Sequence, residues 1–417
     1  MMYNTALILT ILWGVIYLFT RNKISSGKVY FTFLFMMAVP SFFELEFLEK
    51  YIEYPIDYTN IFTLGILLLL GFIPWHYFDK YFCNNYVISI NNEYISILKH
   101  IFVFIIIGSL ISILYLLPYA IQSMAIGAAE VREYIQEESP LPNNFFTTIC
   151  VGFAALHIYC ILFFFISFLT DELKQYRIWL FISSFSYVVS CITITARDGF
   201  IILPTFYVVF YLIFRKSIPT RNKIKIKRAL FLIFGGALIF INIFSLNRFY
   251  NKYHDNTTLL DGTVGYIAQQ PYVFDSTVKL QDDFQGYEVR FPLVNRVMGI
   301  GEYKVDRLDS WFETCFGTMY ADFYNIGGWT PVILVLLVFI IYYRWSLSYC
   351  NRNNKPFAML LIFTVYVYIV LTGIFYCKAG SSISMNIFYI IISITPLFIG
   401  NYITRTAIHD NNYNTHY

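Results

Sequence analysis

Arg197 is the first residue whose type and position point to chemistry. It lies in the segment Thr195-Ala196-Arg197-Asp198-Gly199, between two apolar runs with almost no connecting residues. So short a connection holds the guanidinium near an apolar boundary. The planar guanidinium can donate parallel hydrogen bonds to phosphate oxygens. It can also pair with Asp198 while its head reaches water. Both interpretations, an anion site and a local pair, stay open at this point.

Other cations occur in comparable places. Lys378 lies in a second tight connection, Cys377-Lys378-Ala379-Gly380. One long polar stretch, about 248–327, adds further cations, namely Arg248, Lys252, Lys279, Arg290, Arg296, Lys304 and Arg307. Together with Arg197 they could form a cationic cluster, which suits a phosphate or diphosphate head group.

The sequence contains several candidate acids, and their surroundings do not single out one of them. Asp322 leads into an apolar run and is either a general base or an acid placed at a helix N-terminus. The stretch 248–327 holds many more acids, and their spacing selects none. Glu44 and Glu46 could serve a metal, but residues two apart on a helix face different ways. An ordinary acidic boundary is therefore favoured for that pair.

Several reaction classes lack their sequence signatures. There is no Walker loop, GxGxxG, HExxH, GxSxG or zinc-type spacing. The 7 cysteines form no CxxC pair and lie mostly in apolar runs, so we interpret them as small buried side chains. These absences argue against a nucleotide-driven pump and a soluble-type hydrolase. We expect no metal, no cofactor and no nucleic-acid partner.

The elements that must position these residues are apolar helices. The chain is 58% hydrophobic and 13% charged, with a mean hydropathy of +0.59. Lipid can solvate so much apolar surface, whereas water cannot. We predict an all-α, polytopic transmembrane bundle of about eleven spans with one large extracytoplasmic loop. The predicted spans are 2–19, 29–48, 59–78, 99–118, 147–169, 178–195, 199–214, 229–246, 328–343, 357–376 and 383–402.

Charge asymmetry orients the predicted bundle. Alternate connections carry eighteen Lys and Arg residues, against four in the remaining short ones. By the positive-inside rule the N-terminus is outside, the C-terminus is cytoplasmic and the loop 248–327 is extracytoplasmic. The organisation is therefore helices 1–8 in 1–247, the loop in 248–327, and helices 9–11 with a tail in 328–417. We interpret the basic segment 215–228 as an orientation signal, and the run 2–19 as a retained helix without a cleavage site.

Three segments together resemble the Wzy-type O-antigen polymerases, also called oligosaccharide repeat unit polymerases. Arg-Asp-Gly-Phe-Ile at 197–201 looks like that family's Arg-containing turn opening an apolar helix. YIAQQPYVFD at 266–275 looks like its loop stretch ending in Phe-Asp. TMYADFYNIGG at 318–328 looks like its Thr-x-x-Tyr-x-Asp-Phe-Gly-x-x-Gly segment, with Tyr324 where the family usually has Gly. Ala196 and Asp198 likewise replace small residues that flank the family's Arg.

The resemblance implies a glycosyltransferase at the outer face of the bacterial inner membrane. A chain grown on undecaprenyl diphosphate would be transferred to the non-reducing sugar of a new lipid-linked repeat unit. Membrane lipids, a chain-length regulator and a flippase are the implied partners, and no metal is required. The roles implied are catalytic for Arg197, Asp322 and Arg290. They are substrate-binding for Arg296, Asp275, Tyr320, Lys378 and Arg248.

Three other functions remain as alternatives. An O-antigen ligase would share the outer arginines and the large loop. A polysaccharide transporter or flippase would place ionisable groups in mid-helix, whereas here they gather near helix ends. A metal-dependent lipid-linked glycosyltransferase would use Glu44 and Glu46, and EDTA would abolish its activity.

Overall fold

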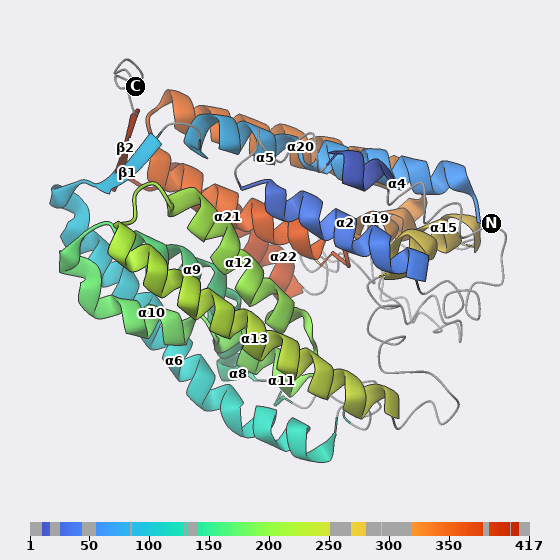
Figure 1. Ribbon diagram of the computed structural model, residues 1–417, viewed down its shortest axis with the longest axis horizontal. Helices are drawn as coiled ribbons and strands as arrows, with labels where there is room; N and C mark the ends of the chain where they lie inside the picture. The colour runs from blue at the N-terminus through green and yellow to red at the C-terminus, as the bar shows by residue number, and fades with distance from the viewer. Residues whose placement is uncertain are drawn as a thin grey trace, which may run out of the picture. The chain divides into compact units, whose positions relative to one another are not determined.

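The computed structural model describes residues 11–16, 26–43, 56–83, 86–127, 131, 141–142, 144–250, 268–280, 293, 318–377, 383–400 and 402–407. This part of the chain is mostly helical (Figure 1). Its α-helices are α2 (Lys28–Phe43), α4 (Tyr58–Gly71), α5 (Ile73–Phe78), α6 (Ile95–Ile126), α8 (Phe145–Ala155), α9 (His157–Ile166), α10 (Arg177–Ser183), α11 (Ser186–Thr193), α12 (Asp198–Phe214), α13 (Thr220–Tyr250), α15 (Gln270–Leu280), α19 (Met319–Gly327), α20 (Trp329–Arg352), α21 (Pro356–Thr372) and α22 (Ile383–Ile394).

Shorter elements complete the described part. A π-helical turn spans Asp79–Cys83, and 3-10 helices span Asn92–Tyr94, Asp171–Tyr176 and Thr395–Phe398. Two strands, β1 (Tyr86–Ile90) and β2 (Ile403–Ala407), pair antiparallel with Tyr86 opposite Ala407 and Ile90 opposite Ile403. This small ribbon departs from the all-α prediction. It forms because both segments are five residues long, rich in β-branched side chains and outside the apolar helices.

Five helical segments of the described chain are long and apolar enough to cross a membrane: Tyr58–Phe82, Asn92–Ile126, Asp171–Thr193, Thr220–Ile243 and Trp329–Arg352. The helices α8 and α9, bent by 41° at their junction, form a sixth if taken as one span. Apolar side chains face outward on these segments; Phe231 is 79% exposed and Leu114 is 71% exposed. Such surfaces fit lipid contact, so the chain has the character of a multi-pass membrane protein.

Four of the remaining predicted spans correspond to shorter apolar helices, and most of the span predicted over 2–19 lies outside the described residues. The described parts of α2, α12, α21 and the α22 region fall below the length expected of a simple span. Some predicted boundaries also differ from the structure. The helix predicted over 229–246 begins at Thr220, directly after Pro219, and so includes most of the basic segment. Lys and Arg are good helix formers. The basic residues before 229 therefore limit the apolar run, but the helix continues through them to its start after Pro219.

The chain divides into two compact units, each assembled from three stretches. The first contains Met1–His76, Ser245–Ser346 and Val365–Thr395, and the second contains Tyr77–Phe244, Leu347–Thr364 and Pro396–Tyr417. In the second unit α6 packs against α8, α10 and α11, and α9 against α12. Its core is aromatic: the rings of Phe78 and Phe363 stack, and Phe165 packs against Tyr207.

The core of the first unit surrounds the end of α4. Three tyrosine hydroxyls donate to carbonyls near its end: Tyr30 to Leu68 at 2.9 Å, Tyr320 to Leu67 at 2.8 Å, and Tyr366 to Gly71. The last carbonyls of a helix have no partner within the helix. Tyr30 of α2 and Tyr366 of α21 satisfy two of them where α4 meets α5, and Tyr320 of α19 adds a contact to the carbonyl one turn earlier.

Candidate functional site

The turn that carries Arg197 is tightly hydrogen-bonded. Between α11 and α12, the Ala196 amide donates to the Cys191 carbonyl at 2.9 Å, and the Thr195 amide donates to the Ile192 carbonyl at 3.0 Å. Thr195 has a φ of 50°, a left-handed conformation that is unfavourable for a β-branched residue. Such strain costs about 1–3 kcal/mol and persists only where the surroundings impose it. The turn that presents Arg197 is therefore a constrained structure.

Asp198, the first residue of α12, is held by side chains from α11. The Tyr187 hydroxyl donates to one carboxylate oxygen, and the Cys191 thiol donates to the other at 3.1 Å. Both donors are buried. The carboxylate thus joins the start of α12 to α11, and it has partners other than its neighbour Arg197. Pairing with Arg197, one of the two interpretations that the sequence leaves open, stays a prediction.

Gly199 lets the two helices approach each other closely at this point. A Cβ atom there would lie 2.9 Å from the Cys191 Sγ and 3.3 Å from the Val188 Cα. Both distances are too short for ordinary van der Waals contact, and the second atom belongs to the backbone. A glycine at this position is therefore required for the observed packing of α12 on α11.

Two further contacts, from α6 and α9, hold the α11 side of the same turn. The Ser123 hydroxyl of α6 donates to the Thr193 carbonyl at the end of α11 at 2.8 Å. The His157 ring stacks on the Tyr187 ring, with centroids 4.3 Å apart and planes within 9°. His157 is fully buried at the bend between α8 and α9. Four helices therefore contribute to the surroundings of one hairpin.

The chemistry available at this turn is that of anion binding. Arg197 is half-buried and occupies the N-cap position of α12, where the helix dipole adds partial positive charge. A guanidinium in such a place is suited to an oxyanion such as phosphate. An anion site at Arg197 stays a prediction from the sequence.

From the sequence we did not single out Tyr187, Cys191 or His157. One usable signal was present: Tyr187 and Cys191 are four residues apart and share a helix face. A hairpin as short as 194–197 must return α12 against a face of α11. No comparable local signal marks His157, because its contact with Tyr187 depends on how α9 packs.

Asp275 lies in the first unit, on α15, which packs against α4 and α19. Its carboxylate is 3% exposed and accepts hydrogen bonds from the Asn60 side-chain amide at 2.8 Å and the Asp57 backbone amide at 3.0 Å. It also forms an ion pair of 3.2 Å with Lys279, four residues along the helix. Lys279, which we had counted among the loop cations, is thus neutralised within the protein.

Asp322 does not lead into the ninth predicted helix as expected. It lies inside the separate helix α19, which ends at Gly327, and the left-handed φ of 79° at Gly328 separates α19 from α20. The carboxylate is 4% exposed and accepts a hydrogen bond from the Cys377 backbone amide at 2.6 Å. It therefore holds the residue just before Lys378 and does not cap α20.

Tyr320 is completely buried, and its hydroxyl donates to the Leu67 carbonyl. This contact gives Tyr320 a structural role at the end of α4, and its substrate-binding role stays a prediction. Arg290, Arg296 and Lys378 lie outside the described residues, as do Glu44 and Glu46. Arg248 belongs to α13, but its side chain is not among those described. The predicted convergence of Arg290 and Arg296 with Arg197 therefore stays a prediction.

Among the described residues, no group of three or more His, Cys, Asp or Glu side chains could hold a metal ion. Comparisons of the chain with protein-family models, curated proteins and solved structures give no match.

Proposed function

We propose that this protein is a membrane glycosyltransferase. It polymerises undecaprenyl-diphosphate-linked oligosaccharide repeat units into O-antigen or a related surface polysaccharide. The observation that carries the proposal is the constrained Arg197 turn at the start of α12. The apolar helices and the resemblance of 197–201, 266–275 and 318–328 to the O-antigen polymerase family support it.

The reaction needs stabilisation of a departing diphosphate. The bond between the donor sugar's anomeric carbon and the diphosphate oxygen breaks, and a glycosidic bond to the acceptor hydroxyl forms. Negative charge develops on the leaving diphosphate, and donors fixed in advance lower the energy of that state. In this proposal Arg197 and Arg290 bind the diphosphate, while Arg296, Arg248, Lys378, Asp275 and Tyr320 contribute to substrate binding.

The acceptor hydroxyl must lose its proton as it attacks. We assign that proton to the Asp322 carboxylate. The same carboxylate accepts the hydrogen bond from the Cys377 amide, which holds it in place. The reaction takes place on the outer face of the bacterial inner membrane, next to a flippase and a chain-length regulator as partners.

A reconstituted reaction tests this function. The purified full-length protein is given lipid-linked repeat units with no lipid A core acceptor, and the products are separated by length. A polymerase lengthens the lipid-linked chains, and EDTA leaves the yield unchanged. If the chains stay at one unit until a core acceptor is added, the protein is a ligase and the proposal is wrong. If EDTA abolishes elongation, the metal-dependent alternative replaces it.

A further inference from the structure

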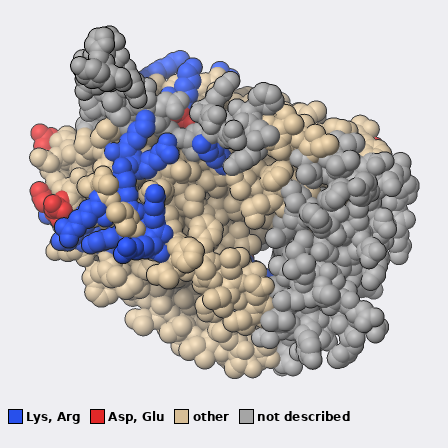
Figure 2. Space-filling model, in the orientation of Figure 1, with Lys and Arg blue, Asp and Glu red and all other residues tan. Residues whose placement is uncertain are grey.

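The connection between α12 and α13 carries an unusual density of positive charge. The basic segment 215–228 contains seven Lys and Arg residues and no Asp or Glu. Its exposed side chains are Arg215, Lys216, Arg221, Lys225, Lys227 and Arg228. Figure 2 shows Lys and Arg atoms gathered beside the start of α13.

The polypeptide that presents these cations is packed onto the second unit. The Ser217 hydroxyl oxygen accepts a hydrogen bond of 2.8 Å from the Ile88 amide of β1. Ile218 and Ile226 are each only 2% exposed, so one face of the segment is anchored in the interior. The cations therefore project from a formed surface with a fixed spacing.

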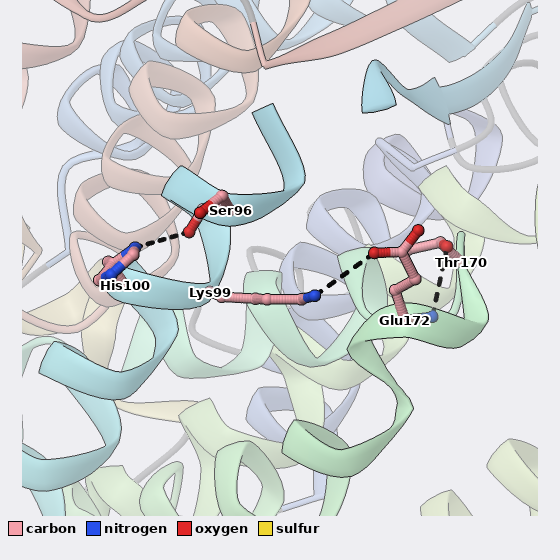
Figure 3. A network of polar contacts seen from close by, with 5 residues as sticks. All are labelled: Ser96, Lys99, His100, Thr170 and Glu172. Carbon is pink, nitrogen blue, oxygen red and sulfur yellow. Dashed lines mark hydrogen bonds and ion pairs between the residues drawn. The ribbon is translucent and has the colours of Figure 1, made fainter. Parts of the chain in front are cut away.

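Two other cations of the same unit have partners within the protein. Lys99 forms an ion pair of 3.3 Å with Glu172 (Figure 3). Arg177 donates to the carbonyls of Ser167 at 2.9 Å and Thr170 at 3.3 Å. Within the described part of the chain, none of the seven side chains of the basic segment has an ion pair or hydrogen bond.

Helix stability does not account for this arrangement. Arg221 and Lys223 lie in the first turn of α13, which contains no acidic residue. The helix dipole opposes positive charge at that end, and Arg221 and Lys225 repel each other at four-residue spacing. The segment would gain stability from an external anion that offsets these repulsions.

The neighbouring surface identifies the kind of anion. Phe231 and Leu232, which begin one turn after Arg228, are 79% and 72% exposed. At 1.5 Å per residue the last cation lies about 5 Å along the helix from side chains suited to hydrocarbon. That separation places the cations at the depth of lipid headgroups. A soluble polyanion would not need an apolar surface continuous with its site.

We propose that the basic segment 215–228 is a binding surface for anionic phospholipid headgroups. This inference is independent of the glycosyltransferase proposal, because it uses only the charges of the α12–α13 connection and the apolar surface of α13. From the sequence we interpret this segment only as an orientation signal, on the basis of its charge. The proposal adds a lipid-binding role.

Lipid selectivity of the reconstituted protein tests the proposal. The full-length protein is placed in phosphatidylcholine bilayers with a trace of spin-labelled phosphatidylglycerol or spin-labelled phosphatidylcholine. Electron paramagnetic resonance then measures the fraction of each label held at the protein. We expect a preference for phosphatidylglycerol that weakens as sodium chloride is raised. No preference in the wild-type protein, or one insensitive to salt, overturns the proposal.

Matched variants locate the surface. Each cation near anionic headgroups contributes about fivefold to association. Arg221→Gln with Arg228→Gln should therefore remove most of the preference, while Arg221→Lys with Arg228→Lys keeps it. Arg344→Gln with Arg352→Gln removes the same charge from α20 and should leave most of the preference.

Equal losses of the preference in both glutamine pairs would mean a bulk charge effect. Displacement of the lipid by inorganic phosphate, but not by chloride of equal ionic strength, would mean a site for free phosphate. Either result refutes the proposal.

Discussion

Arg197 and Asp198 are adjacent in the chain but have different surroundings. Asp198 is engaged by Tyr187 and Cys191 on α11, whereas Arg197 is the half-buried residue that precedes α12. In the proposed function Asp198 holds the helix, whereas Arg197 binds the diphosphate. Substitutions at the two positions should therefore have different consequences, one mainly for stability and the other mainly for activity.

The first prediction concerns Arg197. Arg197→Ala should abolish polymer, and Arg197→Lys should leave clearly reduced activity, because lysine keeps the charge without the planar pair of donors. Loss of a charge-assisted contact made in the transition state costs about 3 kcal/mol, or about a hundredfold in rate. Lipopolysaccharide ladders on a gel, beside a blot for protein amount, measure this. Full-length ladders from Arg197→Ala would contradict the assignment.

The second prediction concerns the Tyr187 hydroxyl. Tyr187→Phe removes the donor to the Asp198 carboxylate and should lower the free energy of unfolding by about 1.5–3 kcal/mol. Tyr207→Phe is the matched control, because the Tyr207 hydroxyl is buried in the same unit and its partner is the neutral Ser184 hydroxyl at 3.0 Å. That loss should be about 0.5–1.5 kcal/mol. Thermal unfolding of the purified proteins compares the two, and a larger effect at Tyr207 would count against the role of Asp198.

At the scale of elements, the contact between α11 and α12 decides where Arg197 lies. The third prediction is that Gly199→Ala destabilises the protein by about 1–3 kcal/mol, because the added methyl group meets Cys191 and the backbone of Val188. Gly235→Ala in α13 is the control, since a Cβ there has nothing within 4 Å. An alanine in that open helical position should be neutral or stabilise by about 0.4–1 kcal/mol. Equal melting temperatures for the two variants would show that the α11–α12 approach is not limiting.

The contacts among α4, α15 and α19 give structural roles to two residues that the sequence analysis assigned to substrate binding. Asp275 and Tyr320 were chosen as substrate-binding residues, yet both bond to α4 or its N-terminal residue. These bonds fix the two ends of α4, since Asp275 holds Asp57 and Asn60 while Tyr320 holds Leu67. Both side chains are buried among packed helices, and their substrate-binding role stays a prediction.

At the scale of the whole molecule, the distribution of Lys and Arg predicts orientation. The fourth prediction is that alkaline phosphatase fused at Gly286 is active and fused at Tyr417 is inactive, because the enzyme folds only outside the cytoplasm. The expectation rests on the eighteen-to-four bias of the connections. Inactivity at Gly286 together with activity at Tyr417 would reverse the predicted topology.

The sequence by itself determined the helical, membrane-like character of the chain. A run of about twenty apolar residues is recognisable as a candidate membrane helix without knowledge of its neighbours, because its solvation by lipid depends on composition and length. The Asp275–Lys279 ion pair depends on the helix α15, which the sequence analysis did not predict within the stretch 248–327. By contrast, the tight connection at Arg197, and the glycine beside it, could be read directly from the order of residues.

Only the tertiary structure decided which polar groups meet. Asn60 and Asp275 are separated by 215 positions, and Asp322 and Cys377 by 55, so no local pattern pairs them. Tyr320 contacts the Leu67 carbonyl of α4, and His157 stacks on Tyr187, through the packing of helices distant in sequence. The physical reason is that a buried polar group must find a partner, and the packing of neighbouring helices determines which one lies within reach.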